Sequence, residues 1–270
     1  FVIQPFAGPP EVEYPTGISA AANGDVYVSI DKNASLDHHK DFGRIVRARD
    51  TDGDGKADDF VDFVPTLDSP RGGHFVGGSF YLIHPPYLSA YRDTDGDGVA
   101  DEHKQLVKGF GWGIEHPRGA DHTTNGVRMG IDGWLYVGVG DFGMPDAVGA
   151  DGTRYTLHGG GVVRVRPDGS EMEPYALMTR NHFAPAITPY LDLFVRDNTN
   201  DGKGWNTRLH HFTHMGDHGY PRLYKNFADE AILPLADYGG GSGTGSAYIH
   251  EPGFPGSFGD MLYTCDWTTG

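Results

Sequence analysis

The sequence predicts an all-β fold built from a repeated sheet unit. Glycine and proline are dense, with 41 Gly and 18 Pro among 270 residues, and this density of turns favours many short strands over helices. A second observation is a turn followed by alternating aromatic and aliphatic residues, which recurs along the chain as NGDVYVSI, GGSFYLIH, DGWLYVGV, YLDLFVRD and FGDMLYTC. No heptad or sustained helical periodicity competes with this pattern.

The aromatic residue near the centre of each recurrence defines the repeat. These anchors are Tyr27, Tyr81, Tyr136, Phe194 and Tyr263, at spacings of 54, 55, 58 and 69 residues. A short apolar run precedes the first four anchors (TGISAAA, GGHFVG, NGVRMGI, PAITPY), and a second run follows them (GRIVRAR, YLSAYR, GGVVRVR, TRLHHF). A further run closes the first three units (DDFVDFV, HKQLVKGF, MEPYALM). Four strands per unit predict a β-propeller of four-stranded antiparallel blades.

A β-sandwich is the alternative architecture, but it does not need the same order of strands to recur. The fifth unit stops near its anchor strand, in DMLYTCDWTTG. A propeller closes on itself to remove its sheet edges, and four and a half blades leave two edges open. We therefore expect residues 1–270 to form a single propeller domain within a longer polypeptide.

Composition excludes several classes of protein. The formal net charge of −16 argues against a nucleic-acid partner, because phosphates repel such a surface. Cys265 is the only cysteine, which excludes an internal disulfide, a four-thiolate zinc site and a covalent c-type haem in this chain. We expect no transmembrane segment, since no run approaches about 20 apolar residues. The start, FVIQPFAGPP, lacks the features of a signal peptide, as in a mature or trimmed N-terminus.

Two nearly identical acidic loops predict metal binding. Each has carboxylates at positions 1, 3, 5 and 9, glycine at position 6, and a residue at position 7 that can offer its backbone carbonyl. The predicted ligands are Asp50, Asp52, Asp54, Lys56 and Asp58 in the first loop, and Asp93, Asp95, Asp97, Val99 and Asp101 in the second. A tight loop that turns alternate oxygens inward makes a hard-oxygen cage suited to Ca²⁺.

The position of these loops indicates a structural role. An EF-hand is excluded because position 12 is Val61 or Lys104 rather than glutamate. Both loops fall between the third and fourth strands of their blades, where the third blade has only the short turn at Pro167–Gly169. Since one blade replaces the feature with a bare turn, we expect the ions to stabilise outer hairpins, as in the calcium hairpins that integrin-type propellers carry.

Polar residues at the start of each first strand are candidates for a site, because first strands line the channel of a propeller. The segments are Pro15-Thr16, Ser69-Pro70-Arg71, Asp121-His122-Thr123-Thr124-Asn125 and Arg180-Asn181-His182. A histidine beside a carboxylate, with an arginine from the next blade, offers a base for a substrate hydroxyl and a cation for the resulting anion. The alternative is a channel that is polar only because water fills it.

Several segments resemble the soluble quinoprotein sugar dehydrogenases. Asp121-His122 followed by NGVRMGIDGWLYVGVGDFG is similar to the segment of that family that carries the catalytic histidine, and TLHGGGVVRVRPDGS resembles its next strand. Arg180-Asn181 and GDHGYP resemble the family's Arg-Asn pair and its glycine-aromatic-proline turn. The DTDGDG repeats and DNTNDGKGWNTR are closest to the membrane-bound dehydrogenase domain of large bacterial haem-containing proteins.

The resemblance implies a six-bladed propeller that binds pyrroloquinoline quinone (PQQ) in its mouth. His122 would be the general base, Asp121 would orient it, and Arg180 with Asn181 would contact the quinone. A further Ca²⁺ would be held partly by backbone carbonyls in the region Asp197, Asn198, Thr199 and Asn200. A sugar or alcohol would be the substrate, and a c-type haem domain or cytochrome would take the electrons. The resemblance and the calcium loops also imply a periplasmic, cell-surface or secreted bacterial protein.

Two other functions stay open at the level of sequence. One is a non-catalytic, calcium-stabilised propeller that binds carbohydrate or protein. The other is a propeller lactonase, which needs an axial metal held by Glu, Asn and Asp side chains; the nearest glutamate candidate is Glu251, in the incomplete fifth unit.

Overall fold

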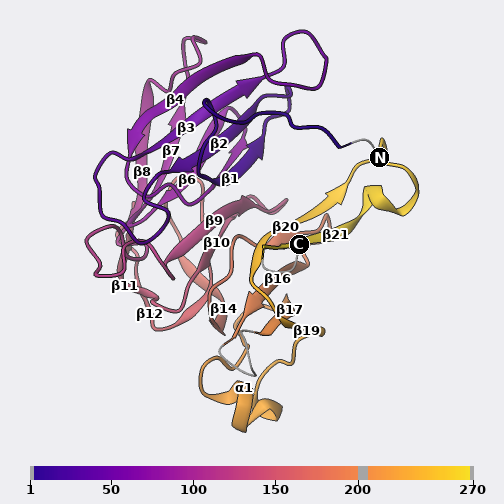
Figure 1. Cartoon of the computed structure of the whole chain (residues 1–270). Coiled ribbons are helices and arrows are strands. Elements are labelled where there is room, and N and C mark those ends of the chain that lie inside the picture. Colours follow the sequence, from indigo (N-terminus) through magenta and orange to yellow (C-terminus); the bar gives the residue numbers. More distant parts are fainter. Residues whose placement is uncertain (1–2, 200–205, 268–270) are drawn as a thin grey trace.

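The computed structural model describes residues 3–199 and 206–267. Short antiparallel sheets follow one another in chain order around a common centre (Figure 1). This arrangement confirms the predicted β-propeller fold. Within the described residues, none of the helices is both long enough and apolar enough to span a membrane.

Four sheets contain the predicted units, each with its strands paired in sequence order. The first sheet is β1 (Pro15–Ala20), β2 (Val26–Asp31), β3 (Gly43–Arg49) and β4 (Asp59–Leu67). The second contains β5 (Gly73–Val76), β6 (Ser79–His84), β7 (Tyr87–Arg92) and β8 (Glu102–Lys108). The third contains β9 (Thr124–Met129), β10 (Leu135–Val139), β13 (Gly160–Val165) and β14 (Glu173–Thr179). The fourth is β15 (Ala186–Ile187), β16 (Leu193–Asn198), β17 (Asn206–Phe212) and β19 (Ala236–Gly240).

Other elements are additions to this repeat. The hairpin of β11 (Met144–Gly149) and β12 (Arg154–Leu157) leaves the third sheet after β10 and extends the second sheet by pairing with β8. The short β18 (Gly216–Asp217) pairs in parallel with β14. A last antiparallel pair consists of β20 (Gly243–His250) and β21 (Asp260–Asp266). The helical turns are α1 (Leu223–Asn226), η1 (Ala228–Glu230) and η2 (Gly256–Gly259).

The aromatic anchors lie where the repeat predicts them. Tyr27, Tyr81, Tyr136 and Phe194 lie in β2, β6, β10 and β16, the second strand of each successive unit, and Tyr263 lies in β21. Two of them pack toward the following sheet: Tyr27 stacks on Phe75 and Phe80, and Tyr136 belongs to a buried cluster with Leu193 of the next sheet. The core therefore consists of apolar layers between neighbouring sheets.

Glycine allows the inner strands to approach one another at the centre. A Cβ atom on Gly17 of β1 would lie 2.7 Å from the Cα of Gly72, which precedes β5. A Cβ atom on Gly126 of β9 would lie 2.8 Å from the Cβ of Ala184, and Gly126 has a φ of 71° that side chains disfavour. The first strands of successive units thus meet backbone to backbone, and the residues at their starts are brought close together.

Candidate functional site

His122 lies at the start of the inner strand β9, in a turn with a left-handed backbone (φ 52°). Its side chain is 12% exposed. Nδ1 hydrogen-bonds to Oδ1 of Asp141, and Nε2 lies 3.5 Å from Nη2 of Arg180. A carboxylate accepts and a guanidinium donates, so these partners fit the tautomer with hydrogen on Nδ1 and a lone pair on Nε2.

The carboxylate on Nδ1 is Asp141, whereas the sequence pointed to Asp121. Asp121 forms an ion pair of 2.5 Å with Arg118, and its Oδ1 lies 3.9 Å from Nε2 of His122. Asp141 follows β10, whose residue Val139 pairs with Thr124 of β9. Continuing that register beyond the strand ends brings Asp141 beside His122. The signal was present in the Gly-Asp pair near the end of the quoted segment NGVRMGIDGWLYVGVGDFG, but the shorter sequence separation favoured the adjacent Asp121.

The fourth sheet holds Arg180 and Asn181 through side chains of β16. Both oxygens of Asp197 accept backbone N–H groups, from Arg180 at 2.8 Å and from Asn181 at 2.9 Å. Oδ1 of Asn198 accepts a bond of 2.7 Å from Nη1 of Arg180. The buried guanidinium is therefore fixed from one side by β16 and directed with Nη2 toward His122.

Asp197 is a buried carboxylate, and burial raises its pKa, while nearby His182 and the backbone N–H groups oppose that shift. Its side chain positions Arg180 and Asn181. Thr199 is also buried, with its N–H bonded to the carbonyl of Asn206. Asn200 lies outside the described residues. The proposed contacts of this segment with a cofactor calcium stay predictions.

Aromatic rings surround the exposed side of His122. Phe142 stacks on the imidazole at 5.3 Å between ring centroids, and His116 lies 5.0 Å from Phe142. Trp112 lies 5.2 Å from His116, donates its indole N–H to the carbonyl of Phe142, and is 36% exposed. The loop before β9 therefore places an aromatic surface beside the histidine.

The two acidic loops connect β3 to β4 and β7 to β8, as predicted. The third sheet has a short turn at the equivalent point, closed by a bond from Arg166 N–H to the carbonyl of Ser170. The loops therefore belong to the outer half of their blades, away from His122 and the inner strands.

Within each loop, backbone N–H groups hold the carboxylates in the same way. Asp50 accepts the N–H groups of Gly55 and Gly53, which lower its pKa, and Asp93 accepts the equivalent pair in the second loop. Ligand oxygens of three residues lie within 4.8 Å of one another in each loop: Asp50, Asp52 and Asp54, and Asp93, Asp95 and Asp101. This set of carboxylate oxygens suits Ca²⁺.

The remaining predicted ligands make equivalent hydrogen bonds in the two loops. Asp58 accepts bonds from the N–H and hydroxyl of Thr51, and Asp101 accepts the equivalent bonds from Thr94. Asp54 and Asp97 accept the N–H groups of Lys56 and Val99, the two residues expected to offer carbonyls. Calcium binding by either loop stays a prediction.

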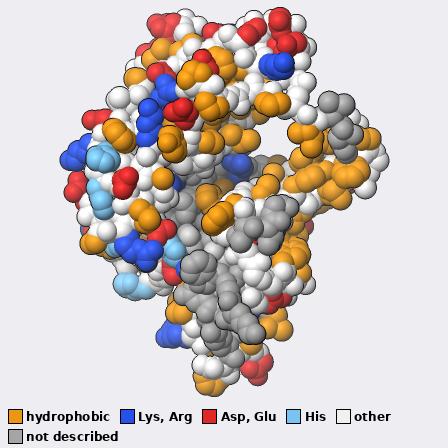
Figure 2. Space-filling view, viewed as in Figure 1, with side chains coloured by type: hydrophobic (Ala, Val, Ile, Leu, Met, Phe, Trp, Pro, Cys, Tyr) orange, Lys and Arg blue, Asp and Glu red, His pale blue; other side chains and the backbone are white. Residues whose placement is uncertain are grey.

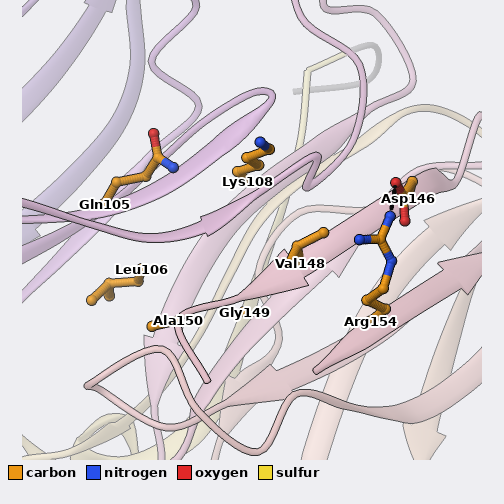
Figure 3. Close-up of a pocket in the computed structure, with 8 residues that line it drawn as sticks. All are labelled: Gln105, Leu106, Lys108, Asp146, Val148, Gly149, Ala150 and Arg154. Carbon is orange, nitrogen blue, oxygen red and sulfur yellow. Dashed lines mark hydrogen bonds and ion pairs between the residues drawn. The ribbon is translucent and has the colours of Figure 1, made fainter. Parts of the chain in front are cut away.

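A separate groove of about 300 Å³ lies between β8 and the added hairpin (Figure 3). Its lining includes Lys108 and the exposed ion pair between Arg154 and Asp146. The groove lies at the outer edge of the second sheet, and none of the predicted catalytic or cofactor residues lines it. We assign no function to it.

Residues 1–235 match the protein family described as "Domain of unknown function (DUF7133)". The chain belongs to this family. Among curated proteins, none matches the chain.

Solved structures share the fold of this DUF7133 protein. The PQQ-bound aldose sugar dehydrogenase from Streptomyces coelicolor has a TM-score of 0.65 and 18% identity, over 88% of this chain and 72% of that one. A putative oxidoreductase described as a glucose dehydrogenase, from Thermus thermophilus, has a TM-score of 0.53 and 18% identity, over 94% and 76%. The PQQ domain of a pyranose dehydrogenase from Coprinopsis cinerea has a TM-score of 0.54 and 13% identity, over 87% and 61%. At these identities the similarity shows a sugar-dehydrogenase-like propeller fold.

Proposed function

We propose that this protein is a PQQ-dependent dehydrogenase that oxidises a sugar or an alcohol. The observation that carries the proposal is the placement of His122 between the carboxylate of Asp141 and the guanidinium of Arg180. This arrangement provides an oriented base and a fixed cation at the start of an inner strand. The similarity of the fold to PQQ-bound sugar dehydrogenases supports the choice of cofactor.

The residues of the site would take the proton of the substrate hydroxyl and stabilise the negative charge that develops on its oxygen. When bound, PQQ supplies the electron acceptor for the oxidation. Nε2 of His122 accepts the proton of the substrate hydroxyl, while Asp141 fixes the tautomer and stabilises the imidazolium that forms. Nη2 of Arg180, on the same side as Nε2, stabilises the substrate oxygen as its proton leaves.

The donors near His122 fit a polyanionic quinone. Arg180 offers a buried guanidinium directed by Asn198. Asn181 accepts a bond of 3.3 Å from Asn125 through Oδ1, and its Nδ2 donates to none of the described residues. Arg180 and Nδ2 of Asn181 would therefore hold quinone oxygens. The backbone carbonyls of Asp197, Asn198, Thr199 and Asn200 stay the expected ligands of the calcium ion.

The surroundings favour a sugar over a small alcohol. Phe142 and the partly exposed Trp112 form an aromatic surface next to the base, and amphipathic aromatic rings suit a ligand that is apolar on one face and polar at its edges. The electrons would pass to a c-type haem domain or a cytochrome. A periplasmic, cell-surface or secreted location accords with such a partner.

Reconstitution tests this function. Full-length apo-protein with PQQ and Ca²⁺ should gain the absorbance of bound quinone and reduce an artificial acceptor with members of a sugar and alcohol panel. His122→Ala should lower turnover roughly 10²- to 10⁴-fold and retain PQQ binding. His158→Ala, which removes an exposed histidine of the β12–β13 turn, is the matched control. An absence of bound quinone, or wild-type turnover in His122→Ala, would contradict the proposal.

A second candidate is a non-catalytic, calcium-stabilised propeller that binds carbohydrate. The exposed aromatic surface around Trp112 favours it. Sugar binding that is lost in Trp112→Ala, with no turnover after PQQ is added, would support this candidate over the dehydrogenase.

A further inference from the structure

A second cavity, of about 590 Å³, lies where the inner strands of the propeller meet. Its wall includes the start of β1, the start of β20, and the glycines at which successive inner strands approach, Gly72 and Gly126. Figure 2 shows a hollow beside the centre of the molecule with a basic side chain in its wall. The volume is typical of sites that bind small molecules, which span about 300–1,000 Å³.

Arg128 lines this cavity with a cation that no acidic group balances. Its Nη1 donates to the carbonyl oxygens of Gly73 at 3.2 Å and Val127 at 3.1 Å. No carboxylate in residues 3–199 or 206–267 forms an ion pair with it. Burial lowers the pKa of Arg128, and no neighbouring negative charge opposes that shift. Arg128 is only half-buried, so an anion that enters the cavity can reach its guanidinium and would supply the missing negative charge.

Arg71 lines the same cavity and is only 5% exposed. Its Nη2 lies 3.1 Å from Oδ2 of the fully buried Asp31, and its Nη1 donates to the hydroxyl of Ser35 at 3.0 Å. Nε of Arg71 has no hydrogen-bond partner among the described residues. Asp31 balances Arg71, so the charged side chains lining the cavity have a net charge of one positive unit, centred on Arg128.

The rest of the wall combines hydroxyl groups with apolar surface. Ser35, Thr244 and Ser246 contribute hydroxyls, while Ile18 and Phe183 contribute apolar faces. A ligand with a carboxylate and no other polar group would bind the arginine side chain but would make no contact with these hydroxyl groups. A compact polyol with one carboxylate matches the cation, the hydroxyls and the apolar faces together.

We propose that this central cavity binds a carboxylate-bearing monosaccharide, a hexuronate, with its carboxylate on Arg128. The site is independent of the proposed dehydrogenase chemistry, because it needs neither His122 nor the quinone.

Calorimetric titration of the full chain without PQQ tests the site. Galacturonate and galactose form a matched pair that differs by a carboxylate in place of a hydroxymethyl group. Galacturonate should bind at least tenfold more tightly than galactose, and acetate should compete with it. Arg128→Gln should weaken galacturonate binding roughly 10- to 100-fold, the usual effect of losing a hydrogen bond from a charged donor. Arg154→Gln, at the outer edge of the second sheet, should bind like wild type.

Three results would overturn the proposal. The first is equal affinity for the two sugars, or no binding, in wild-type protein; this comparison needs no variant and stands even if Arg128→Gln fails to fold. The second is unchanged galacturonate affinity in a folded Arg128→Gln protein. The third is displacement of galacturonate by PQQ with Ca²⁺, which would assign the arginines to carboxylates of the cofactor.

Discussion

Acidification from pH 7.5 to 5.5 should destabilise the protein through four histidines, of which His84, His210 and His218 are buried and His74 is half-buried. Burial, reinforced by nearby cationic groups, lowers the pKa of His84 and His210 to about 3 and of His74 and His218 to about 4. The unfolded chain binds these protons near pH 6.5. The stability that depends on neutral imidazoles is therefore complete above about pH 6.5 and is lost as the pH falls from there toward 3 to 4.

The size of the effect follows from proton linkage. Each histidine lowers the free energy of unfolding by about 1.4 kcal/mol for every pH unit between about 6.5 and its pKa in the folded protein. Between pH 7.5 and 5.5 the loss is therefore about 1.4 kcal/mol per histidine, and roughly 5 kcal/mol for the four. This is comparable with the whole stability of many domains, about 5–15 kcal/mol. Asp197 has the opposite effect on stability. Burial raises its pKa, so the folded protein binds a proton more readily than the unfolded chain and gains stability as the pH falls.

Denaturant unfolding at several pH values measures this slope. His84 bonds to the hydroxyl of Ser89 at 2.9 Å inside the second sheet, so His84→Gln keeps a polar group there and removes the titration. Between pH 7.5 and 5.5, this variant should lose about 1.4 kcal/mol less unfolding free energy than the wild type, which lowers the mean slope by about 0.7 kcal/mol per pH unit. His158→Gln, at an exposed position, should leave the slope unchanged. A flat profile between pH 7.5 and 5.5, or equal slopes in the two variants, would refute the reasoning.

Three further predictions concern the site, the loops and the centre of the fold. In the reconstituted enzyme, Asp141→Asn should reduce turnover roughly 10³- to 10⁴-fold by favouring the wrong tautomer of the histidine, whereas Asp121→Asn should cost less than tenfold; steady-state kinetics with similar losses in both would contradict the assignment. Removing calcium with a chelator should lower the melting temperature and re-addition should restore it; a calorimetric titration without heat and a scan without a shift would count against both loops. Gly126→Val should strongly reduce the folded yield, because its Cβ would lie 2.8 Å from that of Ala184, whereas Gly253→Ala, in open space, should behave like wild type in thermal melts; a normal melt for Gly126→Val would disprove the close approach.

The repeated part of the fold could be predicted from the sequence because it depends on local patterns. Alternation around Tyr27, Tyr81 and Tyr136 identified second strands, and glycine-rich turns separated them from their neighbours. Antiparallel neighbours joined by short turns pair with each other, so the order of strands within each sheet followed directly. The apolar faces then pack between sheets, as the buried cluster joining Tyr136 to Leu193 shows.

The additions to the repeat could not be predicted in the same way. The strands β11 and β12 alternate like any others, but alternation does not say which sheet a strand joins. The hairpin leaves the third unit and pairs with β8 of the second, with Val148 opposite Lys108. The two-residue β18 is shorter than any pattern that sequence periodicity can detect.

The sequence suggested that residues preceding the inner strands converge, but it did not suggest the contribution of Asp141, which follows a second strand. His122 and Arg180 precede β9 and β15, so the repeat alone suggested that they converge, and they lie 3.5 Å apart at Nε2 and Nη2. Asp141 is 19 residues from His122, and their contact depends on the pairing of β9 with β10. The adjacent Asp121 was the natural choice from sequence, yet it pairs with Arg118, three residues earlier in the turns that precede β9.

The geometry of the repeat explains why the candidate site and the acidic loops occupy different places in this fold. Outer hairpins can vary without moving the inner strands, so two of them can hold acidic loops while the third has a bare turn. The inner strands approach one another so closely at Gly17 and Gly126 that a side chain there would clash with the neighbouring segment, so variation is concentrated at the strand starts. Those starts come from different sheets, and they supply His122 and Arg180 to the candidate site and Arg71 to the central cavity. A substitution in an outer loop should therefore change the melting temperature before it changes turnover, and a substitution at a strand start should do the reverse.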